Sequence, residues 1–236
     1  MSEIIQINEN SWRIEDNGVR FFLLTGTKEA LLIDSGMQTS NAREIAESLT
    51  ELPLQILNTH ADPDHISGNG MFESVLMNSM EEPLYRAHGG EGIIIPVKGG
   101  DIIDLGDRPL EIIELPGHTQ GSVAILDINH RVLISGDSIQ DGRIFMFGEH
   151  RNMKNYIESL LNLAQYEGRF DTIYPSHGTF PISPEAIPKL ISSAKQILSG
   201  DVEGKVVDVF GKSVTLYQFD VAGFLCAEMF YKRTHP

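Results

Sequence analysis

The chain contains little cysteine, few basic residues and no long hydrophobic run. Among its 236 residues there is one cysteine, Cys226, so no intrachain disulfide can form and we expect a reducing, cytoplasmic location with Cys226 as a packing residue. No segment approaches the roughly 20 apolar residues that a transmembrane helix requires, and residues 1–20 carry acidic groups unlike a signal peptide. These features predict a soluble protein with no membrane partner.

The scarcity of basic residues bears on the partners of the protein. The sequence has 18 Lys and Arg residues against 33 Asp and Glu residues, which gives a net charge of -15. Nucleic-acid binders carry basic stripes that neutralise phosphates, and no such stripe is present here. We therefore expect no nucleic-acid partner and a small-molecule substrate instead. The sequence leaves the oligomeric state open, with a homodimer as one option.

No Pro/Gly/Ser-rich linker divides the chain, so we predict a single domain that spans residues 1–236. Apolar patterning predicts helices at 41–49, 152–166 and 184–198. It also predicts strands at 19–25, 30–34, 54–58, 75–77, 102–105, 110–115, 122–127, 131–135 and 171–174, with strand-like runs across 206–231. Residues 138–151 show no regular period.

Two apolar strands resemble each other, because 31–36 and 132–137 both end in small residues and aspartate. Two similar halves, each a sheet covered by helices, would form an α/β protein with a four-layer αββα sandwich. The internal similarity is loose, and it gains weight because candidate functional residues come from both halves.

The densest chemical signal is His60-Ala61-Asp62-Pro63-Asp64-His65, which directly follows the apolar run 54–57. Imidazole nitrogen and carboxylate oxygen are ligands that borderline divalent cations accept. The alternative is a polar turn whose aspartates cap a short helix. Taken alone, the cluster leaves both interpretations open.

Three further residues follow predicted strands beside glycine: His118, Asp137 and His177. Each could individually be a turn residue. Together with the first cluster they form an ordered set of motifs, namely His60-x-Asp62-x-Asp64-His65, Pro116-Gly117-His118-Thr119-x-Gly121-Ser122, Gly136-Asp137 and Ser176-His177-Gly178. In this respect the chain resembles the metallo-β-lactamase superfamily along almost its whole length.

The resemblance implies a metal-dependent hydrolase with two divalent metal ions, zinc first and iron or manganese as alternatives. One ion would be held by His60, Asp62 and His118, the other by Asp64, His65 and His177, and Asp137 would bridge them. Water activated by the metals would attack a small ester, thioester, lactone or phosphoester. Asp64 is also the candidate catalytic carboxylate. Asp34 matches an aspartate that would orient the site, although it could equally be a turn-capping residue.

Asp62 departs from the usual pattern, because most hydrolases of the superfamily have histidine at this position. By simple charge counting the extra carboxylate brings the centre from about +1 to about zero, which predicts weaker activation of water. Oxygen ligation also favours iron or manganese over zinc. A diiron protein that reacts with oxygen or nitric oxide, as in the flavodiiron branch, is therefore the alternative, and a metal-bound sensor without turnover is a third. Asp62 could also be too short to reach a metal.

The irregular segment 138–151 follows Asp137 and carries Phe145, Met146 and Phe147, so we expect it to form a substrate wall. The alternative is a loop that tucks these side chains into the core. His150 is a candidate for the cleft. We expect His88, His130 and His235 to lie away from the site, and Trp12 to be a packing residue.

Overall fold

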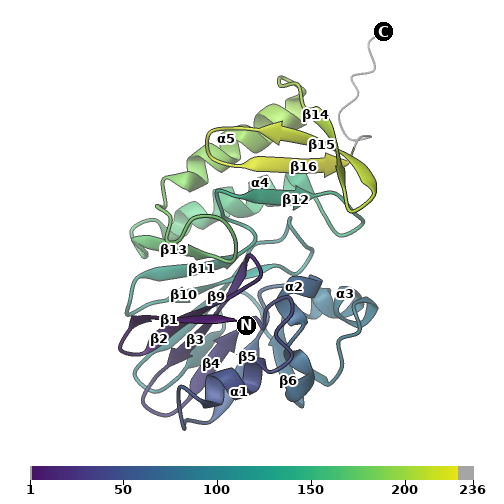
Figure 1. Cartoon of the computed structure of the whole chain (residues 1–236). Coiled ribbons are helices and arrows are strands. Elements are labelled where there is room, and N and C mark those ends of the chain that lie inside the picture. The colour runs from purple at the N-terminus through teal and green to yellow at the C-terminus, as the bar shows by residue number, and fades with distance from the viewer. Residues whose placement is uncertain (1, 228–236) are drawn as a thin grey trace.

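Seven strands form the first sheet of this computed structural model, which describes residues 2–227 (Figure 1). The spatial order follows the chain, and the sheet is antiparallel from β1 to β4 and parallel from β4 to β7. Its strands are β1 (Glu3–Asn8), β2 (Ser11–Asp16), β3 (Val19–Thr25), β4 (Ala30–Ile33), β5 (Leu54–Leu57), β6 (Ser74–Met77) and β7 (Ile93–Pro96).

The second sheet has five strands in the order β13-β11-β10-β9-β8. It contains β8 (Ile102–Asp104), β9 (Pro109–Glu114), β10 (Val123–Asp127), β11 (Val132–Gly136) and β13 (Thr172–Pro175). Phe22 and Leu24 of the first sheet pack with Ile112 and Ile125 of the second in one buried cluster. Because side chains alternate along a strand, Phe21 and Leu23 face the opposite side of the first sheet.

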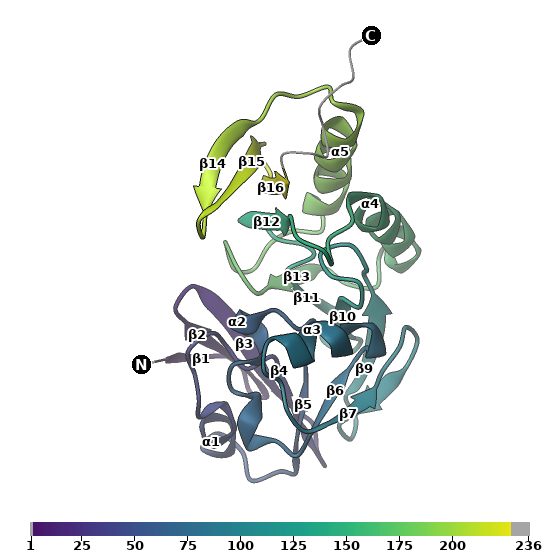
Figure 2. The same ribbon diagram turned by 90° about the vertical axis from the view of Figure 1, so that its right-hand side faces the viewer.

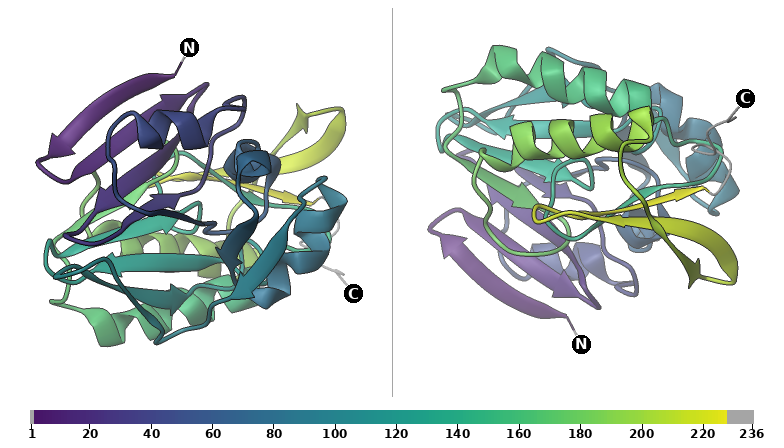
Figure 3. Two further views of the ribbon diagram at one scale, coloured as in Figure 1. Left: turned by 90° about the horizontal axis from the view of Figure 1, so that it is seen from below. Right: turned by 90° about the horizontal axis from the view of Figure 1, so that it is seen from above.

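Helices cover the outer faces of both sheets, so the predicted four-layer αββα sandwich is confirmed. On the first sheet, α1 (Ala42–Glu47) and α3 (Glu82–Ala87) supply side chains to the same cluster as Phe21. On the second sheet, α4 (Met153–Asn162) and α5 (Ala186–Ser199) bury their apolar faces. Figure 3 shows the two helical layers on opposite sides of the paired sheets.

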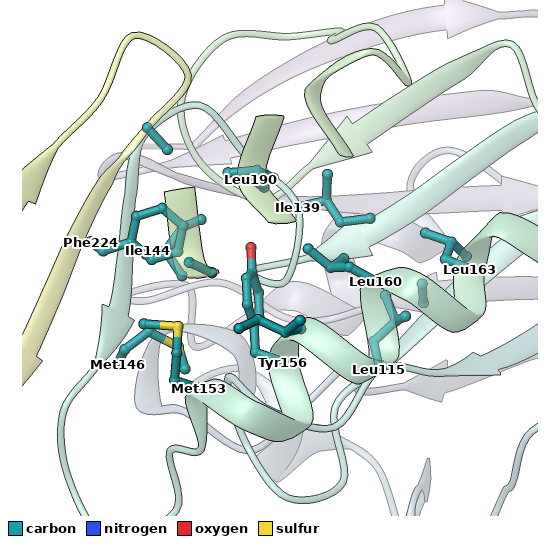
Figure 4. Close-up of a cluster of buried hydrophobic side chains, with 14 of the residues drawn as sticks. Leu115, Ile139, Ile144, Met146, Met153, Tyr156, Leu160, Leu163, Leu190 and Phe224 are labelled. Atoms are coloured by element: carbon teal, nitrogen blue, oxygen red, sulfur yellow. The ribbon is translucent and has the colours of Figure 1, made fainter. Parts of the chain in front are cut away.

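A third sheet of four strands, in the order β12-β16-β15-β14, lies beyond the second sheet next to α4 and α5 (Figure 2). Its strands are β12 (Arg143–Met146), β14 (Lys205–Val209), β15 (Lys212–Gln218) and β16 (Gly223–Ala227). Tyr156 of α4 packs edge-on against Phe224 of β16, with ring centroids 6.0 Å apart (Figure 4). Cys226 is buried in the same cluster, as expected.

The structure corrects several sequence-based predictions of secondary structure. Residues 138–151 are not wholly irregular, because β12 forms there by parallel pairing with the much later strand β16. The predicted helix 152–166 ends as an α-helix at Asn162 and continues as a 3₁₀ turn. The helix expected from 184 begins at Ala186. Sequence patterning missed β1, β2, β7 and α3, and residues 228–231 of the predicted final run lie outside the described residues.

Two short 3₁₀ turns, Asn69–Met71 and Ser79–Glu81, complete the outer layer of the first sheet. Between residues 2 and 227, none of the helices has the length and apolar character needed to cross a membrane.

Candidate metal centre

The seven residues singled out by motif converge at one end of the two facing sheets. His60 follows β5, and Asp64 and His65 lie in the short helix α2 (Pro63–Ile66). His118, Asp137 and His177 follow β9, β11 and β13, respectively. The loops that follow strands of the two facing sheets therefore bring side chains from both halves of the sandwich to one point.

The first group of side chains is His60, Asp62 and His118, whose nearest donor atoms all lie within 4.8 Å of one another. Oδ2 of Asp62 lies 3.4 Å from Nε2 of His60 and 3.2 Å from Nε2 of His118. Asp62 occupies the N-cap position of α2, but its side chain makes no capping hydrogen bond. The helix-capping alternative is therefore wrong for this carboxylate, which turns toward the two imidazoles instead.

The second group is Asp64, His65 and His177, within the same limit of 4.8 Å. Oδ2 of Asp64 lies 3.2 Å from Nε2 of His177 and 3.8 Å from Nε2 of His65. Asp137 lies between the two groups. Its Oδ1 is 3.3 Å from His65 Nε2 and 3.4 Å from His177 Nε2, while its Oδ2 is 3.7 Å from His118 Nε2.

The chemistry of this donor set fits two divalent cations. Nε2 of His60, Nε2 of His65 and Oδ1 of Asp137 are buried and have no hydrogen-bond partner among residues 2–227. Buried polar atoms are normally paired, and three unpaired atoms at one point indicate that a further group belongs there. Imidazole nitrogen and carboxylate oxygen are appropriate ligands for zinc, iron or manganese.

Electrostatics within the cluster show how strongly its members interact. Burial acts to lower the pKa of the His65 imidazole, but the carboxylates of Asp64 and Asp137 outweigh it and hold that pKa well above its ordinary value. Burial acts to raise the pKa of Asp137, but the rings of His177 and His65 hold it well below its usual range. Both shifts have the same cause, which is the close approach of these carboxylates and imidazole rings in a buried site.

Asp34 is a buried hub that orients two of the histidines. Its Oδ2 lies 2.8 Å from Nδ1 of His65 and accepts a 2.8 Å hydrogen bond from the hydroxyl of Thr59. The Thr59 hydroxyl oxygen lies 3.0 Å from Nδ1 of His60, and the Thr59 amide donates to Oδ1 of Asp34 at 2.7 Å. With both Nδ1 atoms engaged outward, the two Nε2 atoms face the centre.

The other two histidines are held by backbone carbonyl groups. Nδ1 of His118 lies 3.1 Å from the carbonyl oxygen of Phe145, and Nδ1 of His177 lies 2.8 Å from that of Gly18. In all four histidines, Nδ1 is therefore held by a protein group and Nε2 is directed toward the centre.

Glu81 was missed by sequence reasoning, yet it links two of the motifs. This buried carboxylate accepts hydrogen bonds from the amides of Ala61, at 2.8 Å, and Gly121, at 2.7 Å. It thereby ties the loop of His60 to the loop of His118. No sequence signal distinguished Glu81 from its exposed neighbour Glu82.

Gly117 is required because the His118 loop lies directly against α4. A Cβ atom on Gly117 would lie 2.4 Å from Cα of Tyr156, and the residue has φ of +149°. The carbonyl group of Gly117 also accepts a 2.8 Å hydrogen bond from the amide of Asn152. The close approach sets the position of the neighbouring His118.

We expect Gly117→Ala to lower stability by about 2–3 kcal/mol, because the backbone of α4 cannot yield as a flexible side chain could. The displaced His118 should also weaken metal binding. Chemical denaturation and metal titration check both effects. Gly168→Ala is the matched control, because Gly168 also has positive φ but has open space around its Cβ position. Equal losses in the two variants would contradict a role for the contact with α4.

Arg151 is a second residue that sequence reasoning missed. Its guanidinium donates to Oδ2 of Asp62 and forms an ion pair with it, and both side chains are largely buried. Charge counting from the sequence gave the centre about zero charge, but the count omitted this cation. With Arg151 included, the local sum returns to about +1, so the expected weakening of water activation by Asp62 loses its basis.

Arg151→Met should raise the affinity for zinc at the group of His60, Asp62 and His118 by about tenfold, because a positive charge beside a cation site repels the ion. Isothermal titration of the metal-free protein measures the change. Arg143→Met is the control, because Arg143 lies nearby without an ion pair within the described chain. Unchanged or weaker zinc binding in Arg151→Met would show that the guanidinium mainly holds Asp62 in place.

A cavity of about 870 Å³ opens onto the cluster. Asp62, Asp64, Asp137 and His177 form its floor, and Phe145 and Phe147 line its side. Phe145 and Phe147 thus lie at the cavity, as expected, whereas Met146 is buried in the core. Their role as a substrate wall stays a prediction.

The remaining histidines divide between the cavity and the surface. His150 lines the cavity, as expected. His88 also lines it, contrary to expectation, because its Nδ1 lies 2.8 Å from the carbonyl oxygen of Ala61. His130 is exposed beside Asp127, and His235 lies outside the described residues. Trp12 packs against the hydrophobic cluster that contains Phe21, on the outer face of the first sheet, as expected.

An αββα sandwich with a His/Asp cluster at one end of its facing sheets defines a class of metal-binding proteins. The sequence profile of the metallo-β-lactamase superfamily matches residues 15–177, and the chain belongs to this superfamily.

Known relatives and structures agree with that assignment. The chain is 26% identical over 201 residues to acyl-coenzyme A thioesterase MBLAC2 of Gallus gallus, covering 68% of this chain and 73% of the relative. It is 34% identical over 116 residues to the mitochondrial persulfide dioxygenase ETHE1 of Homo sapiens, covering 48% of this chain and 44% of that protein. A metallo-β-lactamase from Pontibacter korlensis superposes with a TM-score of 0.72 at 16% identity, over 83% of this chain and 99% of the other.

Proposed function

We propose that the protein is a dinuclear metal-dependent hydrolase that cleaves a small thioester or ester, with lactones and phosphoesters as related substrates. The observation that carries the proposal is the placement of Asp137, whose Oδ1 faces His65 and His177 while its Oδ2 faces His118. A carboxylate that presents one oxygen to each of two donor groups is suited to bridge two ions.

The assignment of residues follows from the two groups. His60, Asp62 and His118 would hold one ion, Asp64, His65 and His177 the other, and Asp137 would serve both. When bound, such ions lower the pKa of water and polarise the carbonyl or phosphoryl oxygen that is attacked. We assign zinc as the first candidate, with iron or manganese as alternatives.

The protein's own groups would position the substrate. The carboxylate of Asp64 is partly exposed to the cavity, whereas that of Asp137 is buried, so Asp64 is the carboxylate that a substrate can meet. His88, whose Nδ1 lies at the carbonyl oxygen of Ala61, lines the cavity and would contact the substrate. Phe145 and Phe147 would exclude water from one side of the reacting bond.

The thioester is placed first among the substrates because one relative is named as an acyl-coenzyme A thioesterase. The acidic composition supports a small-molecule substrate over nucleic acid, and we retain the proposal of a cytoplasmic protein.

The test is a hydrolysis assay on matched thioester, ester, lactone and phosphoester substrates. Protein stripped of metal should be inactive, and addition of two equivalents of zinc, iron or manganese should restore turnover. His177→Ala and His118→Ala should each remain inactive after the same addition. Protein with two bound ions and no turnover of any of the four classes would refute the proposal.

Oxygen chemistry is the second candidate, because Asp62 adds an oxygen donor and another relative is named as a persulfide dioxygenase. Iron-loaded protein that consumes oxygen, but hydrolyses none of the four substrate classes, would favour this alternative.

Metal binding should release protons at neutral pH. The carboxylates of Asp64 and Asp137 raise the pKa of His65, so this ring carries a proton in the metal-free protein and must lose it to bind a cation. Affinity should therefore fall as the pH falls, starting at a higher pH than for an ordinary histidine. Calorimetric titrations at pH 7 in two buffers of different ionisation enthalpy measure the protons released. Identical heats in both buffers would contradict the prediction.

A further inference from the structure

The outer wall of the cavity comes from a part of the chain that the superfamily profile does not cover. Phe210 and Lys212 line the cavity, although the profile match ends at residue 177. Phe210 lies in the turn between β14 and β15, and Lys212 is the first residue of β15. This hairpin extends from the third sheet on the side of the molecule where α2 and α3 lie (Figure 2). The floor of the cavity and the wall residues Phe145 and Phe147 thus lie within the profile match, whereas Phe210 and Lys212 lie outside it.

Phe210 is an aromatic side chain in an exposed and unfavourable position. It is 86% exposed, yet its ring stacks on Phe145 with centroids 6.3 Å apart and an interplanar angle of 17°. Phe145 in turn contacts Phe147, with centroids 5.6 Å apart. The three rings thus form a continuous aromatic surface along the cavity, in which Phe210 is exposed and Phe145 and Phe147 are partly buried.

The positive φ of Phe210 indicates that folding alone does not favour phenylalanine at this position. Phe210 and Gly211 form a two-residue turn with φ of 53° and 73°. Such turns strongly favour asparagine or aspartate before glycine, because a bulky residue at positive φ is strained. A strained residue that buries little of its own surface is typical of a functional position.

Two cationic side chains lie beside this aromatic surface. Arg143 and Lys212 line the cavity, and neither forms an ion pair with any other residue between 2 and 227. Outside the metal cluster, Glu149 is the one carboxylate in the lining as far as the described chain shows. In a chain with a net charge of -15, two unpaired cations at one rim are suited to an anion.

We propose that the substrate is an anion with a flat aromatic or extended apolar group, which stacks on Phe210 and Phe145 while Lys212 and Arg143 receive its carboxylate, sulfonate or phosphate. This inference deepens the proposed hydrolase function, and the ligand is a substrate only if that function is correct. The binding site itself stands on the geometry of the wall. The third sheet therefore sets specificity, while the sandwich supplies the reaction.

The test uses two fluorescent probes that share one aromatic body. 8-Anilinonaphthalene-1-sulfonate is anionic, and N-phenyl-1-naphthylamine lacks the sulfonate. The folded, metal-loaded protein should bind the anionic probe more tightly than the neutral one. Phe210→Ala should weaken both probes by about tenfold. Lys212→Ala should weaken only the anionic probe, by about fivefold.

Controls separate the wall from general effects. Lys205→Ala removes an exposed lysine from the same hairpin outside the cavity and should leave both affinities unchanged. Thermal unfolding should show that Phe210→Ala folds like the parent, because so little of the side chain is buried. Probe binding that is unaffected by Phe210→Ala, or equally strong for both probes, would overturn the inference.

Probe binding also separates this inference from the proposed function. It requires no turnover, so the predicted pattern in a protein without hydrolase activity would refute the function and leave the site intact. Hydrolysis by the parent protein, with unaltered probe binding in Phe210→Ala and Lys212→Ala, would support the proposed function and refute the binding site.

Discussion

Replacement of Asp137 by alanine should abolish hydrolysis, with a loss of about a thousandfold or more, equivalent to roughly 4 kcal/mol of transition-state stabilisation. Asp137 is the residue whose two oxygens face both donor groups. Its loss also removes one of the buried negative charges that attract a cation to the two donor groups. Metal content should fall from two ions toward none, and elemental analysis after dialysis measures it.

Asp171→Ala is the matched control, because Asp171 is an exposed carboxylate that pairs with Arg131 away from the cavity. It should retain metal content and turnover. Circular dichroism should show that both variants fold. Full metal content with normal turnover in Asp137→Ala would refute the bridging role.

Replacement of Asp34 by alanine should weaken metal binding by about ten- to a hundredfold and lower stability by about 1–3 kcal/mol. The change leaves the Thr59 amide without its partner and frees the ring of His65. The His60 ring loses its support as well, because its link runs through the Thr59 hydroxyl to the same carboxylate. Metal competition titrations and denaturation of the metal-free protein measure the two effects separately.

Asp16→Ala provides the comparison for Asp34. The buried carboxylate of Asp16 accepts hydrogen bonds from the amides of Met37, Gln38 and Thr39, and within the described chain it forms no hydrogen bond or ion pair with the seven cluster residues. Its loss should lower stability while metal affinity stays within about threefold of the parent. If Asp34→Ala affects only stability, as Asp16→Ala should, then Asp34 is structural rather than a positioning residue.

The sandwich was predictable because its strands carry strong local signals. Residues 21–24 and 30–33 are apolar throughout, since both faces of β3 and β4 are buried between layers. The strands that were missed lack this property. β1 is largely exposed and begins with Glu3, and β7 is an edge strand whose Ile93 is mostly exposed. β12 exists because β16 pairs with it, and no local pattern can reveal a partner so distant in sequence.

The convergence of the seven His and Asp side chains was predictable because these residues occur in ordered motifs, whereas the groups around them carry no motif. Glu81 and Arg151 resemble ordinary surface residues until folding brings them against the amide of Ala61 and the carboxylate of Asp62. The same holds for Phe210, which meets Phe145 only through the third sheet. Short motifs report what a site contains, and packing from distant segments determines its charge and its walls.

Crystals grown with zinc and measured on both sides of the zinc absorption edge test the central claim most directly. The account predicts two anomalous peaks about 3.5–4 Å apart. One should lie about 2.0–2.2 Å from donor atoms of His60, Asp62 and His118, and the other at the same distance from Asp64, His65 and His177, with Asp137 contacting both. A single peak, or a peak beyond bonding distance of Asp62 and Asp137, would contradict the dinuclear centre.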